Sequence, residues 1–281
     1  MKTFGLVGKS LSHSFSQQYF TNKFKIDNIL DAEYKLFSLS KIDEVKELLK
    51  HPNLQGFNVT IPYKTEIIPY LDKLDSVAQE VGAVNCVVKE NGKWIGYNTD
   101  VVGFDRTLEE AESLMFKSSK VQKFKSLIIQ NTKRSLSNFE GVDGKSGRGS
   151  LYFALILGSG GASKAVCYVL NQRKIPYQIV SRNKTPQTIT YDEITQLIIN
   201  HYPLIINTTP LGMFPHIEEK PPLPYSAINS NHVFIDLIYN PEETLFLKEG
   251  KKQGATTING AMMFYAQAEE SYLRFKKLKE L

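Results

Sequence analysis

The stretch LYFALILGSGGASKAVCYVL, residues 151–170, decides how this chain is expected to fold. It opens with an apolar run, residues 151–157, which is too short to cross a membrane and has the character of a buried parallel strand. Gly158, Gly160 and Gly161 follow, and residues 164–170 are predicted to be helical. Such a strand, turn and helix form a pocket for a pyrophosphate, because glycines let the backbone come close and free N–H groups face the anion. The stretch therefore predicts a dinucleotide site in an α/β fold.

The glycine motif departs from G-x-G-x-x-G at one position, where Ser163 replaces the third glycine. A tight strand-to-helix turn without a ligand is therefore the alternative interpretation. The strand before the turn and the helix after it favour the dinucleotide site.

The next predicted strand, Tyr177–Ser181, indicates which dinucleotide is bound. An NAD site carries an acidic residue about 20 residues beyond the glycines, to bind the ribose 2′-hydroxyl. This chain has Arg182 there, with Lys184 nearby and no acidic residue before Asp192. A guanidinium binds a 2′-phosphate with paired hydrogen bonds, so the position favours NADP(H). The alternative is a solvated arginine.

The net charge of +5 is unevenly distributed along the 281 residues. Residues 117–148 hold eight lysines and arginines against two acidic residues, whereas the rest of the chain holds 26 against 27. The basic character thus belongs to one segment and does not indicate a nucleic-acid-binding surface.

Cysteine usage and hydropathy predict the class of protein. Cys86 and Cys167 lie far apart in apolar runs, which indicates buried thiols in a reducing compartment and no metal site. The first residues lack a signal-peptide core, and no apolar run approaches the length of a membrane span. We expect a cytoplasmic protein without membrane contact.

The first hundred residues alternate between predicted strands and helices, and several polar residues lie at the junctions. Ser14 and Gln17 fit a capping box, and hydroxyls crowded at that helix start would also suit a bound carboxylate. His13 is interpreted as a structural or surface histidine. Pro62 suits the first turn of a helix, which would place Thr60 and Lys64 at a strand-to-helix corner.

Two further residues of this region have a structural alternative. Asn85 lies within a predicted strand, 83–89, and the Asn91-Gly92 pair predicts a hairpin that returns through 94–97. Asp100 precedes a predicted helix, 101–115, and would serve as its cap. Lys64 would equally be a solvated surface lysine.

The motifs of the chain together resemble those of shikimate dehydrogenases. Those of the substrate domain are Ser-His-Ser-Phe-Ser (12–16), Asn-Val-Thr-Ile-Pro-Tyr-Lys (58–64), Gly-Ala-Val-Asn (82–85) and Gly-Tyr-Asn-Thr-Asp (96–100). Gly-Ser-Gly-Gly-Ala-Ser (158–163) resembles the phosphate loop of that family. The segments 207–213, 236–239 and 260–267 resemble its later motifs. The order and approximate spacing match those of the family.

The resemblance implies a set of site residues. Lys64 and Asp100 would be the catalytic pair, across the cleft between two domains, with Lys64 as the proton donor and Asp100 orienting its ammonium. The substrate would be bound by residues with hydroxyl and amide groups: Ser14, Ser16 and Tyr239 for its carboxylate, and Thr60, Asn85, Asp100 and Gln267 for its ring hydroxyls. NADP(H) would be bound by Gly158, Ser159, Gly160, Gly161, Ala162, Ser181, Arg182, Asn183, Thr208, Leu237 and Gly260.

The domain organisation also follows from the resemblance. Residues 1–102 with 260–281 would form an α/β substrate domain, to which the C-terminal helix returns, and residues 103–259 a Rossmann-like NADP-binding domain. Residues 117–150 are an insert relative to the family, and their polar composition predicts a mobile loop. The gap between Arg182 and Tyr191 is too short for the usual helix. The predicted elements beyond it are a helix at 191–200, strands at 204–208 and 233–239, and helices at 241–252 and 262–277, with Met262, Met263 and Phe264 in the core.

The implied activity is reversible NADP-dependent reduction of 3-dehydroshikimate to shikimate, by a monomer or homodimer that binds small molecules. A quinate-using relative is one alternative, against which Ser16, in place of a threonine, argues mildly. A non-catalytic ligand sensor on the same fold is another. Retention of both Lys64 and Asp100 favours the enzyme.

Overall fold

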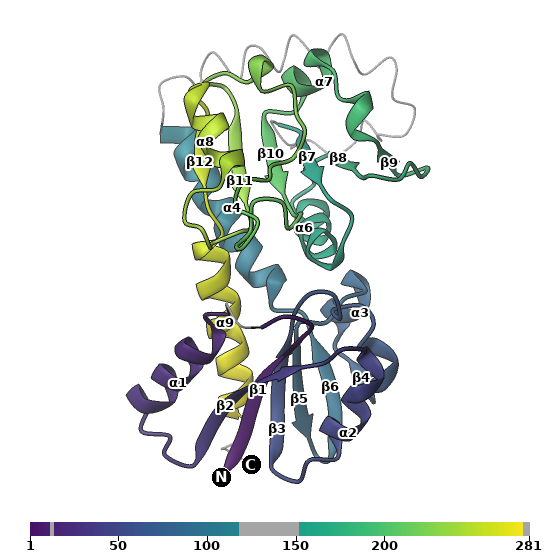
Figure 1. Cartoon of the computed structure of the whole chain (residues 1–281), viewed down its shortest axis with the longest axis vertical. Helices are drawn as coiled ribbons and strands as arrows, with labels where there is room; N and C mark the ends of the chain where they lie inside the picture. Colours follow the sequence, from purple (N-terminus) through teal and green to yellow (C-terminus); the bar gives the residue numbers. More distant parts are fainter. Residues whose placement is uncertain (12–13, 118–151, 278–281) are drawn as a thin grey trace. The chain divides into compact units, whose positions relative to one another are not determined.

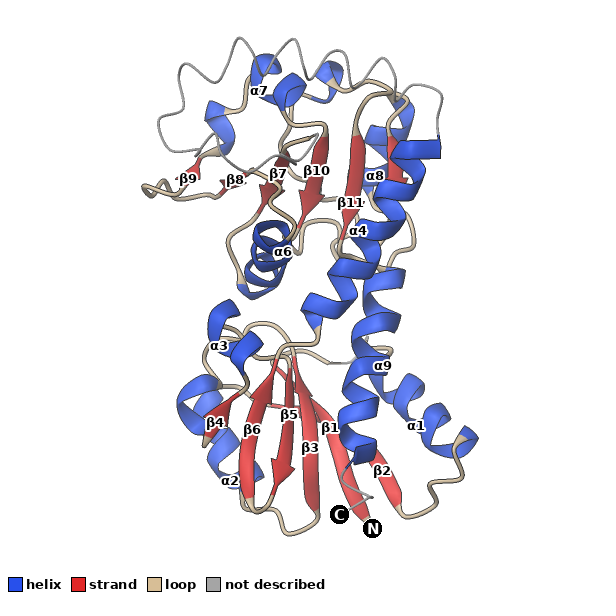
Figure 2. Cartoon of the chain, turned by 180° about the vertical axis from the view of Figure 1, so that it is seen from behind, coloured by secondary structure: helices blue, strands red, loops and turns tan. Residues whose placement is uncertain are grey.

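The computed structural model describes residues 1–11, 14–117 and 152–277 (Figure 1). Apart from Lys117, the insert expected at 117–150 lies outside the described residues, and so does His13. The chain divides into two compact units, Met1–Phe104 with Met263–Leu281, and Asp105–Met262. Each unit is built around its own sheet (Figure 2).

The sheet of the first unit has the strand order β2-β1-β3-β5-β6-β4. Its strands are β1 (Lys2–Gly8), β2 (Ala32–Ser38), β3 (Leu54–Val59), β4 (Lys73–Leu74), β5 (Cys86–Glu90) and β6 (Lys93–Tyr97). β1 pairs in parallel with both β2 and β3, whereas β5 is antiparallel to β3 and β6. The predicted hairpin is confirmed, since Asn91 and Gly92 join β5 and β6 with φ angles of 50° and 77°.

Helices cover both faces of this sheet. The helices of this unit are α1 (Ser16–Ile26), α2 (Val45–Leu49) with the short η1 (Ile42–Glu44), η2 (Ile68–Tyr70), α3 (Ser76–Val81), the start of α4 (Asp100–Lys117) and α9 (Ala261–Lys277). Successive strand residues point to opposite faces, so Phe4 and Leu6 join one apolar cluster and Val7 joins another. The first cluster contains α1 and α9, and the second contains α2 and α3.

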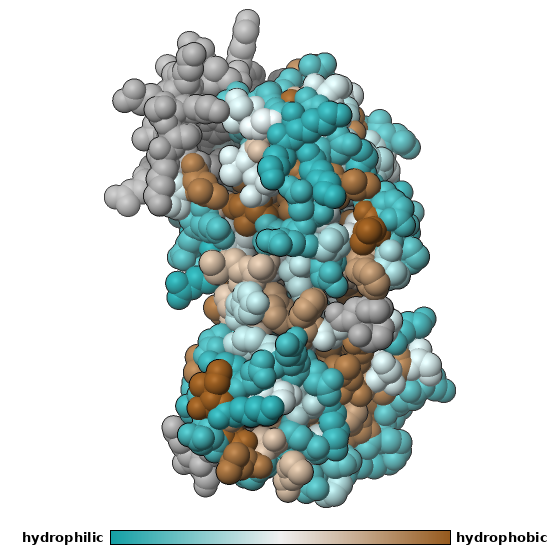
Figure 3. Space-filling model, turned by 60° about the vertical axis from the view of Figure 1, so that its left-hand side comes forward, coloured by the Kyte–Doolittle hydropathy of each residue, from teal (hydrophilic) through white to brown (hydrophobic). Residues whose placement is uncertain are grey.

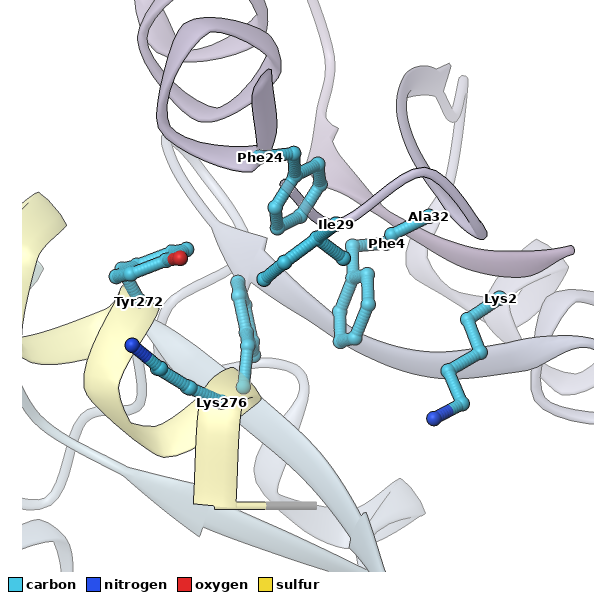
Figure 4. Close-up of a pocket in the computed structure, with 8 residues that line it drawn as sticks. Lys2, Phe4, Phe24, Ile29, Ala32, Tyr272 and Lys276 are labelled. Atoms are coloured by element: carbon cyan, nitrogen blue, oxygen red, sulfur yellow. The ribbon is translucent and has the colours of Figure 1, made fainter. Parts of the chain in front are cut away.

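The helix α9 is attached to the first unit by aromatic contacts. The ring of Phe275 lies 4.8 Å from that of Phe4 and 5.6 Å from that of Phe20. Next to these rings is a small pocket lined by Phe4, Phe24, Ile29 and Tyr272 among others (Figure 4). This packing fixes the rotation of α9, and therefore which of its side chains face the sheet.

The segment after β3 differs from the prediction. Residues 61–67 form turns, so no helix begins at Pro62. Pro69 has no N–H to donate and also prevents a long helix here. The segment is instead held by its buried side chains Tyr63 and Ile67 and by a bond from the Tyr63 hydroxyl to the Leu39 carbonyl, 2.8 Å.

The sheet of the second unit is parallel throughout, with the order β12-β11-β10-β7-β8-β9. Its strands are β7 (Ala154–Leu157), β8 (Tyr177–Val180), β9 (Thr188–Ile189), β10 (Leu204–Asn207), β11 (Val233–Asp236) and β12 (Thr256–Ile258). The chain moves from β7 toward β9 and then returns to the other side of β7 at β10. This change of direction lies between β7 and β10, and ligands bind at such positions in open α/β sheets.

The helices of this unit are the rest of α4, α6 (Gly161–Gln172), η3 (Tyr191–Glu193), α7 (Gln196–His201), η4 (Tyr225–Ala227) and α8 (Leu245–Lys252). One apolar cluster joins Leu155, Leu157 and Phe234 of the sheet with Ile199 of α7 and Phe246 of α8.

The end of α6 is tied to α4. Arg173 donates to Asp105 and Glu112 of α4, at 2.6 and 3.1 Å. All three residues lie in the second unit, and these two ion pairs hold α6 and α4 side by side.

Several predicted boundaries in this unit were wrong. The helix expected at 191–200 is split into η3 and α7, because Ile194 is extended and Thr195 caps α7 with its hydroxyl. The helix expected from Pro241 begins at Leu245, after the cap Thr244. β12 was not predicted. The expected lack of a helix between Arg182 and Tyr191 is confirmed, since β9 occupies that segment.

The surface is mixed in character. Figure 3 shows one face, on which hydrophilic residues predominate and apolar residues form small separate groups. Met262 is 43% exposed and so is not the core residue predicted, although Met263 and Phe264 are buried. In the part of the chain that the structure describes, no helix is long and apolar enough to cross a membrane.

Candidate active site

Lys64 and Asp100 form an ion pair within the first unit. The Lys64 Nζ lies 2.6 Å from Asp100 Oδ2, and the two side chains are 14% and 5% exposed. Lys64 follows β3 and Asp100 is the first residue of α4, so the pair joins residues 36 positions apart. Lys64 is therefore not a solvated surface lysine.

Asp100 does not cap its helix either. The backbone N–H of Val101 donates to Asn98 Oδ1 at 3.3 Å. The two carboxylate oxygens of Asp100 instead accept hydrogen bonds from Lys64 and from Asn85, the latter 2.9 Å from Oδ1. Both oxygens are thus directed at other side chains and not at the helix start.

Asn85 immediately precedes β5, whereas the sequence predicted that it would lie within this strand. Its Oδ1 accepts the backbone N–H of Thr99 at 2.6 Å, which fixes the amide orientation because an N–H can only donate. Its Nδ2 is therefore the group that faces Asp100 and the Thr99 hydroxyl, both at 2.9 Å. The Asn85 amide therefore donates a hydrogen bond to the Asp100 carboxylate.

Gln267 extends this group from α9. Its Oε1 lies 3.4 Å from both Asn85 Nδ2 and Thr99 Oγ1, and the residue is partly exposed. Of the residues predicted to bind the substrate or act in catalysis, the structure thus brings together Lys64, Asn85, Asp100 and Gln267.

Thr60 and the two serines lie at the same edge of this sheet. The parallel pairing of β1 with β3 places the loop after β1 next to Thr60, whose N–H donates to the Val7 carbonyl at 2.9 Å. A Cβ on Gly8 would lie 2.6 Å from Thr60 Cγ2, so glycine is needed for this close approach. That loop leads to Ser14 and Ser16, but none of the described hydrogen bonds joins these serines to the Lys64 group.

The capping box that Ser14 and Gln17 could form, the structural alternative for Ser14, is not present. Ser14 Oγ accepts from the N–H of Ser16, at 3.2 Å, and Gln17 does not return to the helix start. Gln17 Nε2 donates instead to the Tyr34 carbonyl on β2, at 3.1 Å. β2 is an edge strand with unpaired backbone groups, which explains the preference of Gln17 for this acceptor.

In the second unit, the glycine loop joins β7 to α6. Gly158 has a φ of +106°, and a Cβ there would lie 2.7 Å from Thr208 Oγ1. Around Gly160, which caps α6, an added Cβ would meet nothing within 4 Å. Ser163, which stands at the third glycine position, donates to the Gly160 carbonyl at 2.7 Å and so stabilises the loop by a hydrogen bond from its own first helical turn. The loop thus leaves open space beside the free N–H groups of the helix start, as an anion requires.

The residues after β8 lie beside this loop. Ser181 Oγ is 3.1 Å from Ser159 Oγ, and Arg182, Asn183 and Lys184 are exposed. Lys184 pairs with Glu193, whereas Arg182 forms no ion pair with the described residues. The guanidinium of Arg182 is therefore available to an anion. Ala162, in the first turn of α6, is partly buried.

Three other predicted cofactor residues follow the carboxyl ends of strands in this sheet: Thr208 after β10, Leu237 after β11 and Gly260 after β12. The Thr208 hydroxyl donates to the Leu157 carbonyl, 2.7 Å, and the Leu237 N–H donates to the Asn207 carbonyl, 3.1 Å. A Cβ on Gly260 would lie 2.2 Å from the Leu237 carbonyl oxygen, so Gly260 is required for packing. Tyr239, expected to bind the substrate, is partly exposed in the loop after β11.

A buried carboxylate organises the loops after β10 and β11. Asp236 is fully buried and accepts from Asn207 Nδ2 and the Ile238 N–H, both at 3.0 Å, and from the Thr244 hydroxyl at 2.6 Å. Asn207 Oδ1 in turn accepts from the N–H of Thr209 at 3.0 Å. Burial raises the pKa of Asp236 to about 7, and the three hydrogen bonds offset this effect in part.

Sequence reasoning missed four residues of these networks: Asn58, Thr99 and Ser271 in the first unit, and Asp236 in the second. For two of them, Asn58 and Ser271, the periodicity of the strand or helix could have indicated a place in the site. Asn58 precedes Thr60 by two residues in a strand, and Ser271 follows Gln267 by four in a helix, so each shares a face with a predicted residue.

The two cysteines differ in burial. Cys86 is fully buried, as predicted, and burial raises the pKa of its thiol to about 12. Cys167 is only partly buried, and burial also raises the pKa of its thiol. Neither thiol is activated as a nucleophile.

Comparison with known proteins gives consistent matches. A sequence model of the shikimate dehydrogenase substrate binding domain matches residues 6–87. Shikimate dehydrogenase (NADP(+)) from Methanococcus maripaludis is 37% identical over 288 residues, covering 96% of this chain and 90% of that protein. The crystal structure of shikimate dehydrogenase 1 from Peptoclostridium difficile is similar over 99% of this chain and 92% of its own, with 34% identity and a TM-score of 0.74. A shikimate dehydrogenase solved in complex with NADP+ covers 99% and 90%, with 30% identity and a TM-score of 0.73.

The buried Asp236 predicts a specific pH dependence of stability. Its pKa is about 7 in the folded chain and 3.8 ordinarily, so between these values the folded state binds more protons than the unfolded state. The free energy of unfolding contributed by this group therefore falls as the pH rises through that range, by at most about 1.4 kcal/mol per pH unit. Asp236→Asn removes the titration, and we expect the stability of the variant relative to the wild type to increase with pH over this window. Urea unfolding at several pH values measures the difference.

The exposed Asp192→Asn is the matched control and should follow the wild type at every pH. If the stability of Asp236→Asn runs parallel to that of the wild type over the same range, Asp236 is ionised at every pH tested and the account of its burial is wrong.

Proposed function

Because the chain belongs to the shikimate dehydrogenase family, we propose that it catalyses the reversible NADP-dependent reduction of 3-dehydroshikimate to shikimate. The observation that carries the proposal is the Lys64–Asp100 pair, 2.6 Å apart and largely removed from water. It lies in the unit that contains residues 6–87, which match the substrate-binding domain of the family. A sensor that only binds its ligand has no need of a proton donor held in this way.

The reaction requires a proton at the oxygen of the substrate carbonyl. Bound NADPH supplies the hydride, and negative charge then develops on that oxygen. The ammonium of Lys64 donates the proton, and Asp100 holds the ammonium in position by accepting at Oδ2. In the reverse direction the neutral amine of Lys64 accepts the proton from the hydroxyl of shikimate.

The polar side chains around Lys64 account for the binding of a polyhydroxylated ring. Asn85, Asp100, Gln267 and Thr60 would bind ring hydroxyls, since amides and the threonine hydroxyl both donate and accept and the Asp100 carboxylate accepts. Ser14, Ser16 and Tyr239 would bind the carboxylate. Buried polar groups reject ligands that leave them unpaired, so this arrangement favours shikimate over analogues that lack a hydroxyl.

The second unit would bind NADP(H). The pyrophosphate would be bound beside Gly160 by the N–H groups at the start of α6, where the space is open and the helix dipole favours an anion. Ser181, Arg182 and Asn183 would bind the adenosine 2′-phosphate, with Thr208, Leu237 and Gly260 toward the remainder of the cofactor. Apart from Tyr239 and Gly260, we assign substrate binding to residues 1–102 with 260–281 and cofactor binding to residues 103–259.

The wider setting follows from this activity. The ligands are small molecules, and we place the enzyme in the cytoplasm, where NADPH and reduced thiols such as Cys86 and Cys167 are expected. A monomer or a homodimer would be sufficient for the proposed chemistry, and nucleic acid has no part in it.

The direct test is turnover by the purified wild-type chain, followed by the near-ultraviolet absorbance of the reduced nicotinamide. Oxidation of shikimate with NADP+ is the expected result. Faster oxidation of quinate would favour the quinate-using alternative, and binding of shikimate without turnover would favour the sensor.

Lys64→Ala should lower kcat by about 10²–10⁴, the range for the loss of a positioned acid–base group. The affinity for shikimate should change much less, because other side chains bind the ring. Asp100→Asn keeps the shape of the side chain but removes the charge that holds the ammonium, so kcat should again fall more than affinity. Steady-state kinetics on the folded variants provide the measurement.

Lys93→Ala removes an exposed lysine of the same unit and serves as the control, with kcat unchanged. Wild-type turnover in folded Lys64→Ala would remove the basis of the mechanism but not of the fold.

Arg182→Ala should weaken NADP+ binding by about 10- to 150-fold, since a charge-assisted hydrogen bond contributes about 1.5–3 kcal/mol. NAD+ lacks the 2′-phosphate, so its KM should change less than threefold (about 0.6 kcal/mol or less). The measurement is the KM of each variant for NADP+ and for NAD+. Arg106→Ala, which removes an exposed arginine of the same unit, is the control and should leave both KM values unchanged. An equal loss for NADP+ and NAD+ would place the guanidinium away from the 2′-phosphate.

A further inference from the structure

A buried chain of hydrogen bonds continues from the Lys64–Asp100 pair to side chains to which no role has been given. Thr99 and Ser271 are fully buried and Asn58 is 5% exposed. Ser271 Oγ lies 2.9 Å from Asn58 Nδ2 and 3.0 Å from Thr99 Oγ1. Thr99 in turn contacts Asn85, which donates to Asp100. All these residues belong to the first unit.

The direction of each bond at Asn58 follows from its neighbours. The backbone carbonyl of Asn85 can only accept, so the group facing it at 3.3 Å is the Nδ2 of Asn58. The Tyr34 hydroxyl donates to Asn58 Oδ1 at 2.9 Å, in agreement with this orientation. The second hydrogen of Asn58 Nδ2 is therefore directed at the Ser271 hydroxyl oxygen.

The same reasoning fixes the hydroxyl of Thr99. It accepts one hydrogen from Asn85 Nδ2, because Asn85 Oδ1 is occupied by the Thr99 N–H. Its own hydrogen has Ser271 Oγ as the closest acceptor, at 3.0 Å, against 3.3 Å to Asn85 Oδ1 and 3.4 Å to Gln267 Oε1. Ser271 can accept this hydrogen because its own points to the Gln267 carbonyl at 2.9 Å.

The oxygen of Ser271 thus accepts two hydrogen bonds, one from Asn58 Nδ2 and one from the Thr99 hydroxyl. The Cys86 thiol also lies against Ser271, and as a weak donor it does not compete with the amide and the hydroxyl. Without this oxygen, the hydrogen of Thr99 would turn to Asn85 Oδ1 or to Gln267 Oε1. Either change would disturb a side chain of the candidate site.

We propose that Ser271 is a positioning residue of the active site. By accepting from Asn58 and Thr99, it holds the Thr99 hydroxyl as an acceptor for Asn85 and so keeps the Asn85 amide directed at Asp100. The inference rests on the proposed function and adds to it the element that aligns the catalytic pair. Because Ser271 and Gln267 are four residues apart in α9, one face of this helix carries both the Gln267 amide, proposed to bind substrate, and the hydroxyl that positions Asn85 through Thr99.

Ser271→Ala tests the proposal, since it removes the acceptor and leaves two buried donors unpaired. We expect kcat for shikimate oxidation to fall about 5- to 30-fold in the folded variant, with KM for NADP+ changed less than twofold. Thr3→Val is the matched control. It removes another buried hydroxyl of the same unit, which bonds Glu33 at 2.9 Å, and kcat should stay at the wild-type value.

A double-variant cycle separates positioning from damage to the fold. If Ser271 acts through Asn85, adding Ser271→Ala to Asn85→Ala should lower kcat by less than a further twofold. Losses that multiply would show that Ser271 acts independently of Asn85 and would overturn the proposal. Should Ser271→Ala not fold, Thr99→Val and Thr99→Ser replace it, and only the valine should lose activity.

The outcomes distinguish the two proposals. Wild-type kcat in Ser271→Ala, measured beside an active wild type and an active Thr3→Val, would overturn the positioning role and leave the proposed function intact. A wild type that does not oxidise shikimate would overturn both.

Discussion

The structure of the first unit depends on one constraint, which is that a lysine and an aspartate share a largely dry position. Taking two charges out of water is costly, and their attraction compensates only when the remaining hydrogen-bonding groups are satisfied. The chain meets this requirement with Asn85, which occupies the second oxygen of Asp100. The bonds continue through Thr99 and Ser271 to Asn58. The pairing of β1 with β3, the segment after β3 and the aromatic packing of α9 all serve to bring these groups together.

The second unit meets a different requirement, because we propose that it binds the phosphates of NADP(H). Its parallel strands end at one edge, where the glycine loop, the Ser181–Asn183 segment and Thr208 lie in neighbouring positions. Here the protein supplies N–H groups and the guanidinium of Arg182, which forms no ion pair within the described part of the chain. Asp236 is the exception, because it is an acidic group in the interior, satisfied by the backbone and by Asn207 and Thr244. It ties two loops of this edge to the sheet.

Much of this could be predicted from the sequence. The glycine turn, the hairpin at Asn91-Gly92 and the α/β fold follow from local patterns, and the family resemblance supplied the candidates Lys64 and Asp100. The turn after β3 could not be predicted, because its conformation depends on where Tyr63 and Ile67 are buried. The role of Gln17 depends on an edge strand that is distant in sequence. Ser271 was missed for the same reason, since its partners, Asn58 and Thr99, come from other elements.

In the proposed mechanism an ammonium at position 64, held by Asp100, moves the proton. Lys64→Cys followed by alkylation with 2-bromoethylamine restores an ammonium at nearly the same place, and alkylated wild type controls for modification of the partly buried Cys167. This mechanism predicts that Lys64→Cys is nearly inactive. When mass spectrometry shows complete modification, kcat should rise by about tenfold or more, which is roughly 1.4 kcal/mol in the barrier. Wild-type turnover before alkylation, or no recovery after complete modification, would contradict it.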